Sequence, residues 1–370
     1  MDLFRYYVNQ WYRNRLRLCD IMYCQIHLTR RCQNECKHCY FRELDVHNGD
    51  FPLGKLIEFL STLKEKASEL KLKPRVDFTG GDPLLYPDLK PAIEICNSLC
   101  IPYGFKCNPE TIVTSDLITK NIIRNSSGVD LSLDGLRLMH DSLRREGSFD
   151  CTLRAIHLLK EMRVKIRINT TVSRRNINNL IPLINFLIKE NIIIDDYTWA
   201  RYWSEENYKE ILTASELRIV FNDMLQYLQV LFSEPSFYIR LPDKRIVPKI
   251  MFGFKEHQWY PFLVHEGMIN DDIQQQILQS PNCINCTGTK HFYIVDPDCS
   301  IYKCRKLRET RIQLAEFGTN ETNALLKGIE SKCKECVFYN GCGGCAAITK
   351  CFTGNMFDVE PSCPYKDQRM

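Results

Sequence analysis

The sequence predicts an α/β fold in which a partial (β/α)6 barrel, similar to a TIM barrel, precedes a small cysteine-rich domain. Short β-rich runs alternate with amphipathic stretches between about residues 22 and 201, a pattern typical of parallel β/α units. Ten of the nineteen cysteines lie from residue 283 onward, in a tail with many glycines and little periodicity. Because this tail has few apolar residues with which to form a core, we expect metal to hold it together.

Six segments are predicted as strands, at residues 22–28, 75–79, 101–106, 129–133, 165–172 and 197–201. Helices are expected at 53–70, at 87–98, from a cap at Ser115 to about 124, at 149–162, at 177–189 and at 213–232. The presence of about six predicted β/α units indicates a curved sheet that does not close into a full barrel. Ligands of such sheets bind at the carboxyl ends of the strands, so we expect the site there.

The periodic pattern weakens between about 235 and 282, where prolines and Gly253 interrupt it. We therefore expect a main domain at 1–234, a linker region at 235–282 and the cysteine-rich domain at 283–370.

The 370-residue chain is nearly balanced in charge, with 49 basic and 45 acidic side chains. This balance gives no global case for binding nucleic acid or an anionic membrane. The N-terminus lacks the basic and apolar regions of a signal peptide, and no run of about 18 apolar residues is present. We expect a cytoplasmic protein, in which cysteines serve as metal ligands or core residues rather than in disulfides.

Cys32, Cys36 and Cys39 follow the first predicted strand with x3 and x2 spacing. Three thiolates can bind three irons of a [4Fe–4S] cube and leave the fourth iron open to another ligand. The alternative is a structural zinc site, which His38 or a distant cysteine would have to complete.

The Cys-x3-Cys-x2-Cys segment resembles the signature of the radical S-adenosylmethionine (SAM) enzymes, which carry an aromatic residue near the last cysteine. Here His38 precedes Cys39 and Tyr40 follows it, which marks Tyr40 as a candidate cofactor-binding residue. The resemblance implies that SAM chelates the open iron and is cleaved reductively to a 5′-deoxyadenosyl radical. That radical would abstract hydrogen from the substrate, with the cofactor carrying the hard chemistry.

A second motif, Gly80-Gly81-Asp82-Pro83, ends the second predicted strand. Paired glycines allow the backbone to approach a ligand closely. The motif resembles the Gly-Gly-Glu-Pro segment of the family, whose backbone receives the methionine amino group. Asp82 stands in place of the usual Glu.

A third block begins with Ser132 at the fourth predicted strand and runs through Asp134-Gly135 to Arg144 and Gly147-Ser148-Phe149. It resembles the corresponding run of radical SAM enzymes with a SPASM tail. The resemblance implies that Ser132 contacts the ribose and Arg144 the carboxylate of SAM, with Arg145 as a neighbouring candidate. Asn169, in the fifth strand, either faces the nucleoside or is a satisfied polar group beside the core.

The Cys-x2-Cys repeats of the tail, taken alone, would suggest zinc ribbons. Together with the front motif they resemble a SPASM domain, which holds two auxiliary [4Fe–4S] clusters. The resemblance implies one nearer ligand set and one farther set, namely Cys283, Cys286, Cys304 and Cys345 for the nearer cluster and Cys333, Cys336, Cys342 and Cys363 for the farther cluster.

Three features of the tail depart from the SPASM pattern. Cys299 occupies the usual glycine position, the spacing from Cys342 to Cys345 is one residue short, and Cys351 is an additional thiol. Cys299 or Cys351 could replace a ligand, or one of them could donate a hydrogen atom.

The resemblance favours modification of a ribosomally made peptide by crosslinking, thioether formation or epimerisation. Formylglycine formation is not expected, because anaerobic sulfatase maturases carry Asp directly after the third auxiliary cysteine, and Arg305 follows Cys304 here. A radical SAM enzyme of a sugar, nucleoside or amino acid is the second hypothesis. A zinc-stabilised interaction protein is the non-enzymatic alternative, which would need neither Gly80–Pro83 nor the block from Ser132 to Arg144.

Many peptide-modifying members carry an N-terminal peptide-binding domain, whereas about 20 residues precede the first predicted strand here. We therefore expect either that a separate protein recognises a peptide substrate or that the substrate is small. We also expect an electron donor such as flavodoxin or ferredoxin. Aromatic residues of the 197–210 stretch either line a substrate cavity past the sixth strand or pack in the core or at its rim, namely Tyr197, Trp199, Tyr202, Trp203 and Tyr208.

Overall fold

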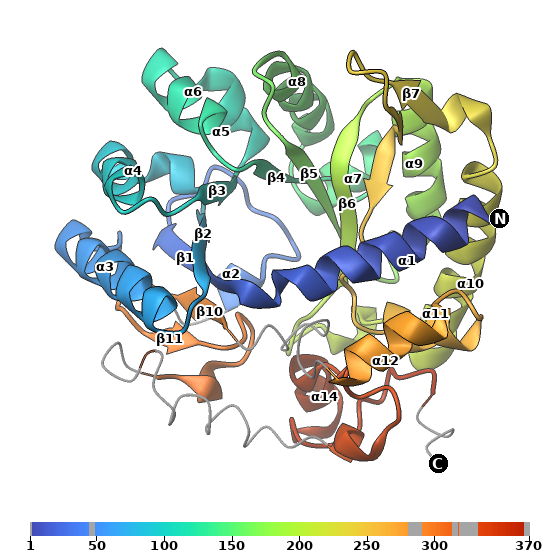
Figure 1. Cartoon of the computed structure of the whole chain (residues 1–370). Helices are drawn as coiled ribbons and strands as arrows, with labels where there is room; N and C mark the ends of the chain where they lie inside the picture. The colour runs from blue at the N-terminus through green and yellow to red at the C-terminus, as the bar shows by residue number, and fades with distance from the viewer. Residues whose placement is uncertain (1, 44–48, 280–290, 313–316, 318–331, 366–370) are drawn as a thin grey trace.

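The computed structural model describes residues 2–43, 49–279, 291–312, 317 and 332–365. Its main feature is a nine-stranded sheet with the order β11-β10-β1-β2-β3-β4-β5-β6-β9 (Figure 1). All neighbouring strands from β10 to β9 are parallel, and only β11 is antiparallel to its neighbour. The α/β class and the partial barrel are confirmed.

The six predicted strands all form and are neighbours in sequence order: β1 (Ile21–Thr29), β2 (Lys73–Gly80), β3 (Tyr103–Lys106), β4 (Val129–Ser132), β5 (Ile166–Val172) and β6 (Ile194–Arg201). The predicted helices are also present: α3 (Leu53–Glu69), α4 (Leu89–Ser98), α6 (Leu117–Arg124), α8 (Ser148–Glu161), α9 (Leu180–Lys189) and α10 (Ala214–Leu231).

The predicted cap of α6 was wrong by one residue. Asp116 is the N-cap, and its carboxylate accepts the Thr119 N–H at 2.7 Å. Ser115 instead ends α5 (Pro109–Thr114) and donates its hydroxyl to the Ile112 carbonyl at 2.7 Å. A carboxylate is stabilised by the helix dipole as well as by the hydrogen bond, so it is a favourable cap.

Several elements were not predicted from the sequence, either because they are short or because their pattern is weak. They are α1 (Leu3–Leu16), α2 (Tyr40–Glu43), α7 (Arg137–Leu143), β7 (Tyr238–Arg240), β8 (Ile246–Pro248), β9 (Ile250–Phe252), α11 (Trp259–His265), α12 (Asp271–Gln279), β10 (Phe292–Val295), β11 (Ile301–Tyr302) and α14 (Ala346–Thr353). Figure 1 shows α1 running across the molecule from the side of α9 and α10, where the N-terminus lies, towards β1.

Both segments beyond the six predicted units add strands to the sheet. β9, from the stretch expected to be a linker region, pairs with β6, and β10 pairs with β1 at the opposite edge. The domain boundaries at 234/235 and 282/283 stay a prediction. Among the described residues, none of the helices is both long and apolar enough to span a bilayer.

The two faces of the sheet differ in chemistry, as β5 illustrates. Ile166, Ile168 and Val172 are buried, whereas Arg167, Asn169 and Thr171 alternate with them and are half-buried. In a strand, alternate side chains point to opposite faces. One face therefore packs into the hydrophobic core, and the other presents polar groups along the inside of the partial barrel.

Candidate functional site

The candidate site lies at the carboxyl ends of the parallel strands, as the sequence predicts. The loop with the front cysteines leaves the end of β1 and runs to α2. The Lys37 N–H donates to the Leu143 carbonyl of α7 at 2.9 Å, which ties this loop to the segment after β4.

The three front thiols lie near one another at the edge of this loop. Cys32 is exposed, and Cys36 and Cys39 are half-buried. The Cys32 thiol itself is partly covered, and this burial raises its pKa, as do the nearby Asp82, Cys36 and Cys39. The Asn34 N–H is 3.5 Å from Cys32 Sγ, and the Cys39 N–H donates to the Cys36 carbonyl at 3.3 Å.

The described side chains of His, Cys, Asp and Glu include no group of three or more placed to hold a single metal ion. In a [4Fe–4S] cube each cysteine binds a different iron. The donor set of three thiols on one tight loop therefore fits the cluster that the sequence predicts.

A buried charge network holds the middle of the loop. Arg144 donates from Nε to Asp134 Oδ2 at 2.6 Å, and its Nη1 lies 3.5 Å from Cys36 Sγ. His38 Nε2 lies 3.2 Å from Arg144 Nη2 and 3.4 Å from Asp134. Burial alone would raise the pKa of the Asp134 carboxyl, but the Arg144 guanidinium and His38 hold it well below its usual range. Arg144 thus faces the cysteine loop, while its neighbour Arg145 is exposed and pairs with Glu110.

The Gly80–Pro83 turn is bound directly to the cysteine loop. The Gly81 N–H donates to the Thr29 carbonyl and the Asp82 N–H to the Arg31 carbonyl, each at 2.7 Å. Gly80 has φ +120°, and a Cβ on Gly81 would overlap the carbonyl oxygens of the loop. These positions therefore need glycine.

Asp82 is buried beneath this turn and does not face solvent. Its carboxylate accepts hydrogen bonds from Thr111 Oγ1 at 2.5 Å and from the Leu84 N–H at 3.2 Å. Burial raises the pKa of Asp82 to about 6. Pro83 begins the short 3-10 helix Pro83–Leu85 and is also buried.

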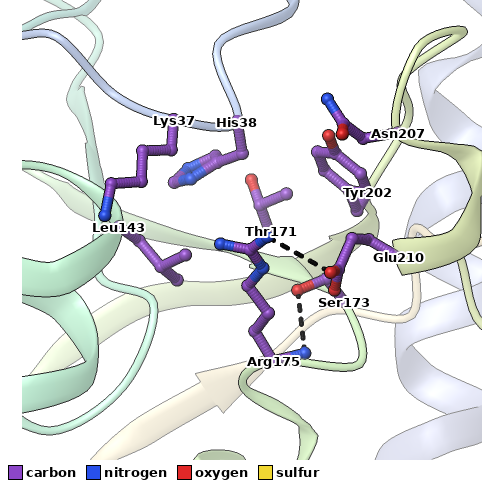
Figure 2. Close-up of a pocket in the computed structure, with 9 residues that line it drawn as sticks. All are labelled: Lys37, His38, Leu143, Thr171, Ser173, Arg175, Tyr202, Asn207 and Glu210. Atoms are coloured by element: carbon purple, nitrogen blue, oxygen red, sulfur yellow. Dashed lines mark hydrogen bonds and ion pairs between the residues drawn. The ribbon is translucent and has the colours of Figure 1, made fainter.

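A cavity of about 210 Å³ opens beside the loop (Figure 2). Its walls come from the cysteine loop, the end of α7, the end of β5 and the segment after β6. The lining residues are Lys37, His38, Leu143, Thr171, Ser173, Arg175, Tyr202, Asn207 and Glu210. Within the described part of the chain, His38 Nδ1 is a buried nitrogen without a hydrogen-bond partner. An unpaired buried nitrogen beside the cysteine loop fits a site that receives a polar ligand.

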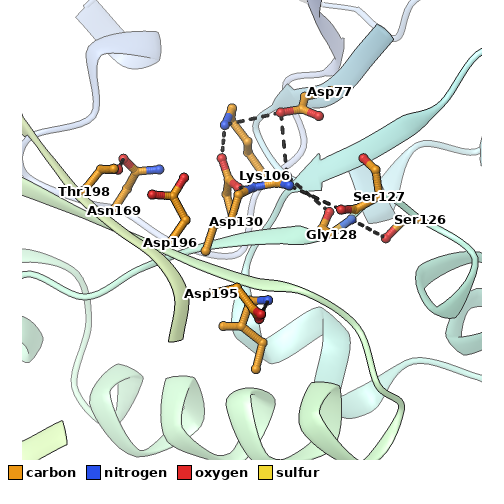
Figure 3. Close-up of polar contacts among 12 residues, drawn as sticks. Asp77, Lys106, Ser126, Ser127, Gly128, Asp130, Asn169, Asp195, Asp196 and Thr198 are labelled. Atoms are coloured by element: carbon orange, nitrogen blue, oxygen red, sulfur yellow. Dashed lines mark hydrogen bonds and ion pairs between the residues drawn. The ribbon is translucent and has the colours of Figure 1, made fainter. Parts of the chain in front are cut away.

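Ser132 and Asn169 lie side by side on the inner face of the sheet, because β4 and β5 pair in that register. Thr198 of β6 donates to Asn169 Oδ1 at 2.7 Å (Figure 3). Toward the other end of the strands, the inner face carries buried ion pairs: Lys106 and Arg167 both contact Asp77 and Asp130. The inside of the barrel is therefore polar along its length.

Tyr40 belongs to a hydrogen-bonded chain that sequence reasoning missed. Its hydroxyl is 3.1 Å from His27 Nε2, and His27 Nδ1 is 2.6 Å from Asp296 Oδ1. The Arg305 guanidinium lies 5.4 Å from the centre of the Tyr40 ring. Burial raises the pKa of Tyr40 to about 12, against the lowering effect of Arg305. The sequence did offer one signal, a histidine between the apolar residues Ile26 and Leu28 of a predicted strand. No sequence pattern indicated its contact with Asp296, which is 269 residues away.

The farther auxiliary set comes together in the structure. Cys333, Cys336, Cys342 and Cys363 line one cavity together with Gly343, Gly344 and Glu360. Cys333 and Cys342 are buried, and a Cβ on Gly344 would lie 3.1 Å from Cys333 Sγ. Four thiols around one recess, with glycine backbone close by, fit an iron–sulfur cluster.

The nearer set is described only in part. Cys283 and Cys286 lie outside the described residues. Cys304 and Cys345 pack against the same small apolar cluster as Cys39, which contains Phe41, Tyr202 and Trp203. The two described members of the set therefore lie close to the front loop.

The two additional thiols occupy different environments. Cys299 has φ 65°, a left-handed conformation that favours glycine, and its charged neighbours include Asp298 and, from α3, Lys55 and Glu58. Cys351 packs on the apolar cluster with Cys304 and Cys345, and Lys306 is among its charged neighbours. Of the two, Cys351 is therefore the one placed near the nearer set.

Residues 26–187 match the radical SAM superfamily. The chain therefore contains a radical SAM domain. It is an iron–sulfur enzyme that uses SAM, as the sequence predicts, and the front loop with its three cysteines lies inside the matched region. Among curated proteins, an AdoMet-dependent heme synthase of Oleidesulfovibrio alaskensis is 24% identical over 366 residues, covering 92% of this chain and 87% of that protein.

Two solved structures share the fold across almost the whole chain. SuiB of Streptococcus suis bound to the precursor peptide SuiA has a TM-score of 0.66 at 17% identity, covering 97% of this chain and 79% of that one. anSMEcpe with bound AdoMet has a TM-score of 0.67 at 16% identity, covering 94% of this chain and 95% of that one. The likeness extends over the cysteine-rich segment as well as the radical SAM domain.

Proposed function

We propose that this radical SAM enzyme modifies a ribosomally synthesised peptide, by crosslinking, thioether formation or epimerisation. The observation that carries the proposal is the fold likeness to two enzymes solved with peptides. One is SuiB with its precursor peptide, and the other is anSMEcpe with the Kp18Cys peptide, whose structure matches this chain with a TM-score of 0.67. Both likenesses include the cysteine-rich segment, which we propose to hold two auxiliary clusters.

The residues at the strand ends have separable roles in this proposal. The front cluster and SAM, when bound, supply a 5′-deoxyadenosyl radical that removes a hydrogen atom from the substrate. Arg144 and Asp134 hold the cysteine loop in place, and Gly80–Pro83 presents backbone to SAM. Ser132 and Asn169 face the inside of the barrel, where we propose that they contact the nucleoside. We also propose that Tyr40, which directly follows Cys39, contacts the cofactor.

The cavity beside the loop supports a polar, extended substrate. Lys37, Arg175 and Glu210 place charges of both signs at its walls, and Arg175 pairs with Glu210 at 3.2 Å. A peptide offers backbone donors and acceptors to such walls and can enter as one segment.

A tetrapyrrole is the second candidate substrate, favoured by the heme synthase relative that covers 92% of this chain. A flat macrocycle would need broad apolar walls, whereas Leu143 and Tyr202 are the main carbon-rich side chains in the cavity lining. We therefore rank the peptide first.

The test follows deuterium from substrate to product. Short peptides encoded next to the gene are produced in deuterated medium and incubated anaerobically with the reduced, iron-loaded enzyme and SAM. An iron porphyrin with deuterated propionate side chains is the parallel substrate. Deuterium in 5′-deoxyadenosine from a peptide, and a matching mass change of that peptide, supports the proposal. Transfer from the porphyrin alone would contradict it.

A further inference from the structure

The end of β6 carries a buried arginine that reaches into the cysteine-rich segment. Arg201 is 3% exposed and Glu360 is 0% exposed. Arg201 donates from Nη1 to the Glu360 carboxylate and to Ser362 Oγ, the latter at 2.7 Å. Its Nε also pairs with Glu256 at 3.1 Å. Residues 159 positions apart in the sequence are thus joined by a fully desolvated ion pair.

The Glu360 carboxylate is surrounded by donors from three segments. Gln258 Nε2 and His257 Nε2 each lie 3.1 Å from Oε2, and Ser362 Oγ donates to Oε1 at 2.7 Å. A buried carboxylate is tolerated only when it is paired and hydrogen-bonded in this way.

Glu360 also contacts both sets of proposed cluster ligands. The backbone N–H of Cys345, from the nearer set, donates to Glu360 Oε2 at 2.6 Å. The backbone N–H of Cys363, from the farther set, donates to the Glu360 carbonyl at 3.1 Å, and the Glu360 side chain lines the farther cavity. One residue therefore connects β6 of the barrel, Cys345 and the farther cysteine cavity.

We propose that Arg201 and Glu360 are positioning residues, which fix Cys345 and the farther cysteine cavity against the end of β6. The inference rests on the proposed auxiliary clusters and goes beyond the proposed function, since it concerns how the barrel holds the C-terminal cysteines. The negative charge of Glu360 beside the cavity is also a determinant of the reduction potential there, because net charge and hydrogen bonds around a cluster set that potential.

The test uses the full chain with Cys32, Cys36 and Cys39 replaced by alanine, so that iron bound after reconstitution reports on the C-terminal cysteines. Iron content is measured, and potentials are determined by redox titration followed by electron paramagnetic resonance. Glu360→Gln is the test variant, since it keeps the shape of the side chain and removes its charge. Asp130→Asn is the matched control, because it removes a buried, paired carboxylate inside the barrel.

We expect Glu360→Gln to raise at least one C-terminal midpoint potential, or to lose a large part of the C-terminal iron, while Asp130→Asn changes neither. Full iron and unchanged potentials in Glu360→Gln would overturn the proposal. If the chain with only Cys32, Cys36 and Cys39 replaced binds no iron, the proposal of auxiliary clusters is itself overturned. That outcome is distinct from a failure of the positioning role alone.

A second variant covers the case in which Glu360→Gln does not fold. Replacing both partners, as Arg201→Met with Glu360→Leu, removes the ion pair. Glu256, which also pairs with Arg201, keeps His257 Nδ1 at 3.1 Å as a partner. Replacing a whole buried ion pair by apolar residues often leaves stability unchanged. We expect this chain to have a native circular dichroism spectrum but to lose C-terminal iron, since Cys345 has lost its acceptor. A folded double variant with full iron would overturn the positioning role.

Discussion

Asp134 and Arg144 form the contact on which the cysteine loop depends most directly. The Asp134 carboxylate is fully buried and accepts from Arg144 at 2.6 Å, and Arg144 in turn reaches Cys36 Sγ and His38. Asp134 Oδ1 also accepts the Thr171 N–H at 2.8 Å. One carboxylate therefore joins the ends of β4 and β5 to the front loop.

We predict that Asp134→Asn lowers the free energy of unfolding by about 3 kcal/mol, because Arg144 loses its buried partner. Iron bound by the front loop should fall as well. Asp243→Asn is the matched control, since Asp243 pairs with Arg245 at the surface and a surface ion pair contributes little to stability. Denaturant unfolding and iron analysis measure both effects. Equal stability of the two variants would contradict the role given to Asp134.

His140 gives a prediction of pH dependence. It is fully buried, its Nδ1 accepts the Asp134 N–H at 3.1 Å, and burial together with the Arg144 charge lowers its pKa to about 4. In the unfolded chain a histidine binds a proton below about pH 6.5. Because the unfolded state then binds more protons than the folded state, stability is lost as the pH falls from about 6.5 to about 4.

Between pH 7 and pH 5 this residue should account for a loss of about 2 kcal/mol of stability. In His140→Gln the free energy of unfolding should lack this loss between pH 7 and pH 5. His157→Gln, at an exposed histidine of α8, should keep the wild-type difference. Urea unfolding at both pH values measures the free energy of unfolding. If its pH dependence in His140→Gln equals that of the wild type, His140 is not the group responsible.

At the scale of elements, the contact between the turn after β2 and the loop after β1 is a backbone contact. Gly81 lies so close to Arg31 that a Cβ has no room, and the facing carbonyls belong to the cysteine loop itself. The two motifs that the sequence suggested separately are therefore one hydrogen-bonded unit.

We predict that Gly81→Ala reduces both front-loop iron and SAM cleavage by at least tenfold, because the loop must move away from the added methyl group. Gly54→Ala is the control. Gly54 is in α3 with open space around it, and alanine there should stabilise the helix by up to about 1 kcal/mol. Iron content and 5′-deoxyadenosine yield check both variants. A Gly81→Ala protein with wild-type iron would show that the close approach is not required.

At the scale of the whole molecule, local patterns predicted the repeating unit but not the ends of the sheet. Strand–helix alternation identified β1 to β6, since each strand and its following helix lie within about 50 residues of sequence. The pairing of Cys24 in β1 with Tyr293 in β10 and of Ile194 in β6 with Ile250 in β9 involves short strands without a pattern of their own. Long-range pairing of this kind is decided by tertiary packing, which the sequence periodicity does not report.

The candidate site divides in the same way. The cysteine motifs and the glycine turn could be recognised because their spacing is local, and the structure places the four farther cysteines around one cavity. The partners that hold them were not predicted. Asp296 for His27 and Glu360 for Arg201 are acidic residues in an irregular segment, and their importance follows only from burial and contact.

The central claim is that Cys32, Cys36 and Cys39 hold the cluster that cleaves SAM. The decisive measurement compares the wild-type protein with the triple alanine variant, both reconstituted without oxygen, reduced and mixed with SAM, by quantifying 5′-deoxyadenosine with mass spectrometry. We predict product from the wild type and none above background from the variant, although the variant keeps C-terminal iron. Equal product from the two proteins, or none from an iron-loaded and reduced wild type, would contradict the account.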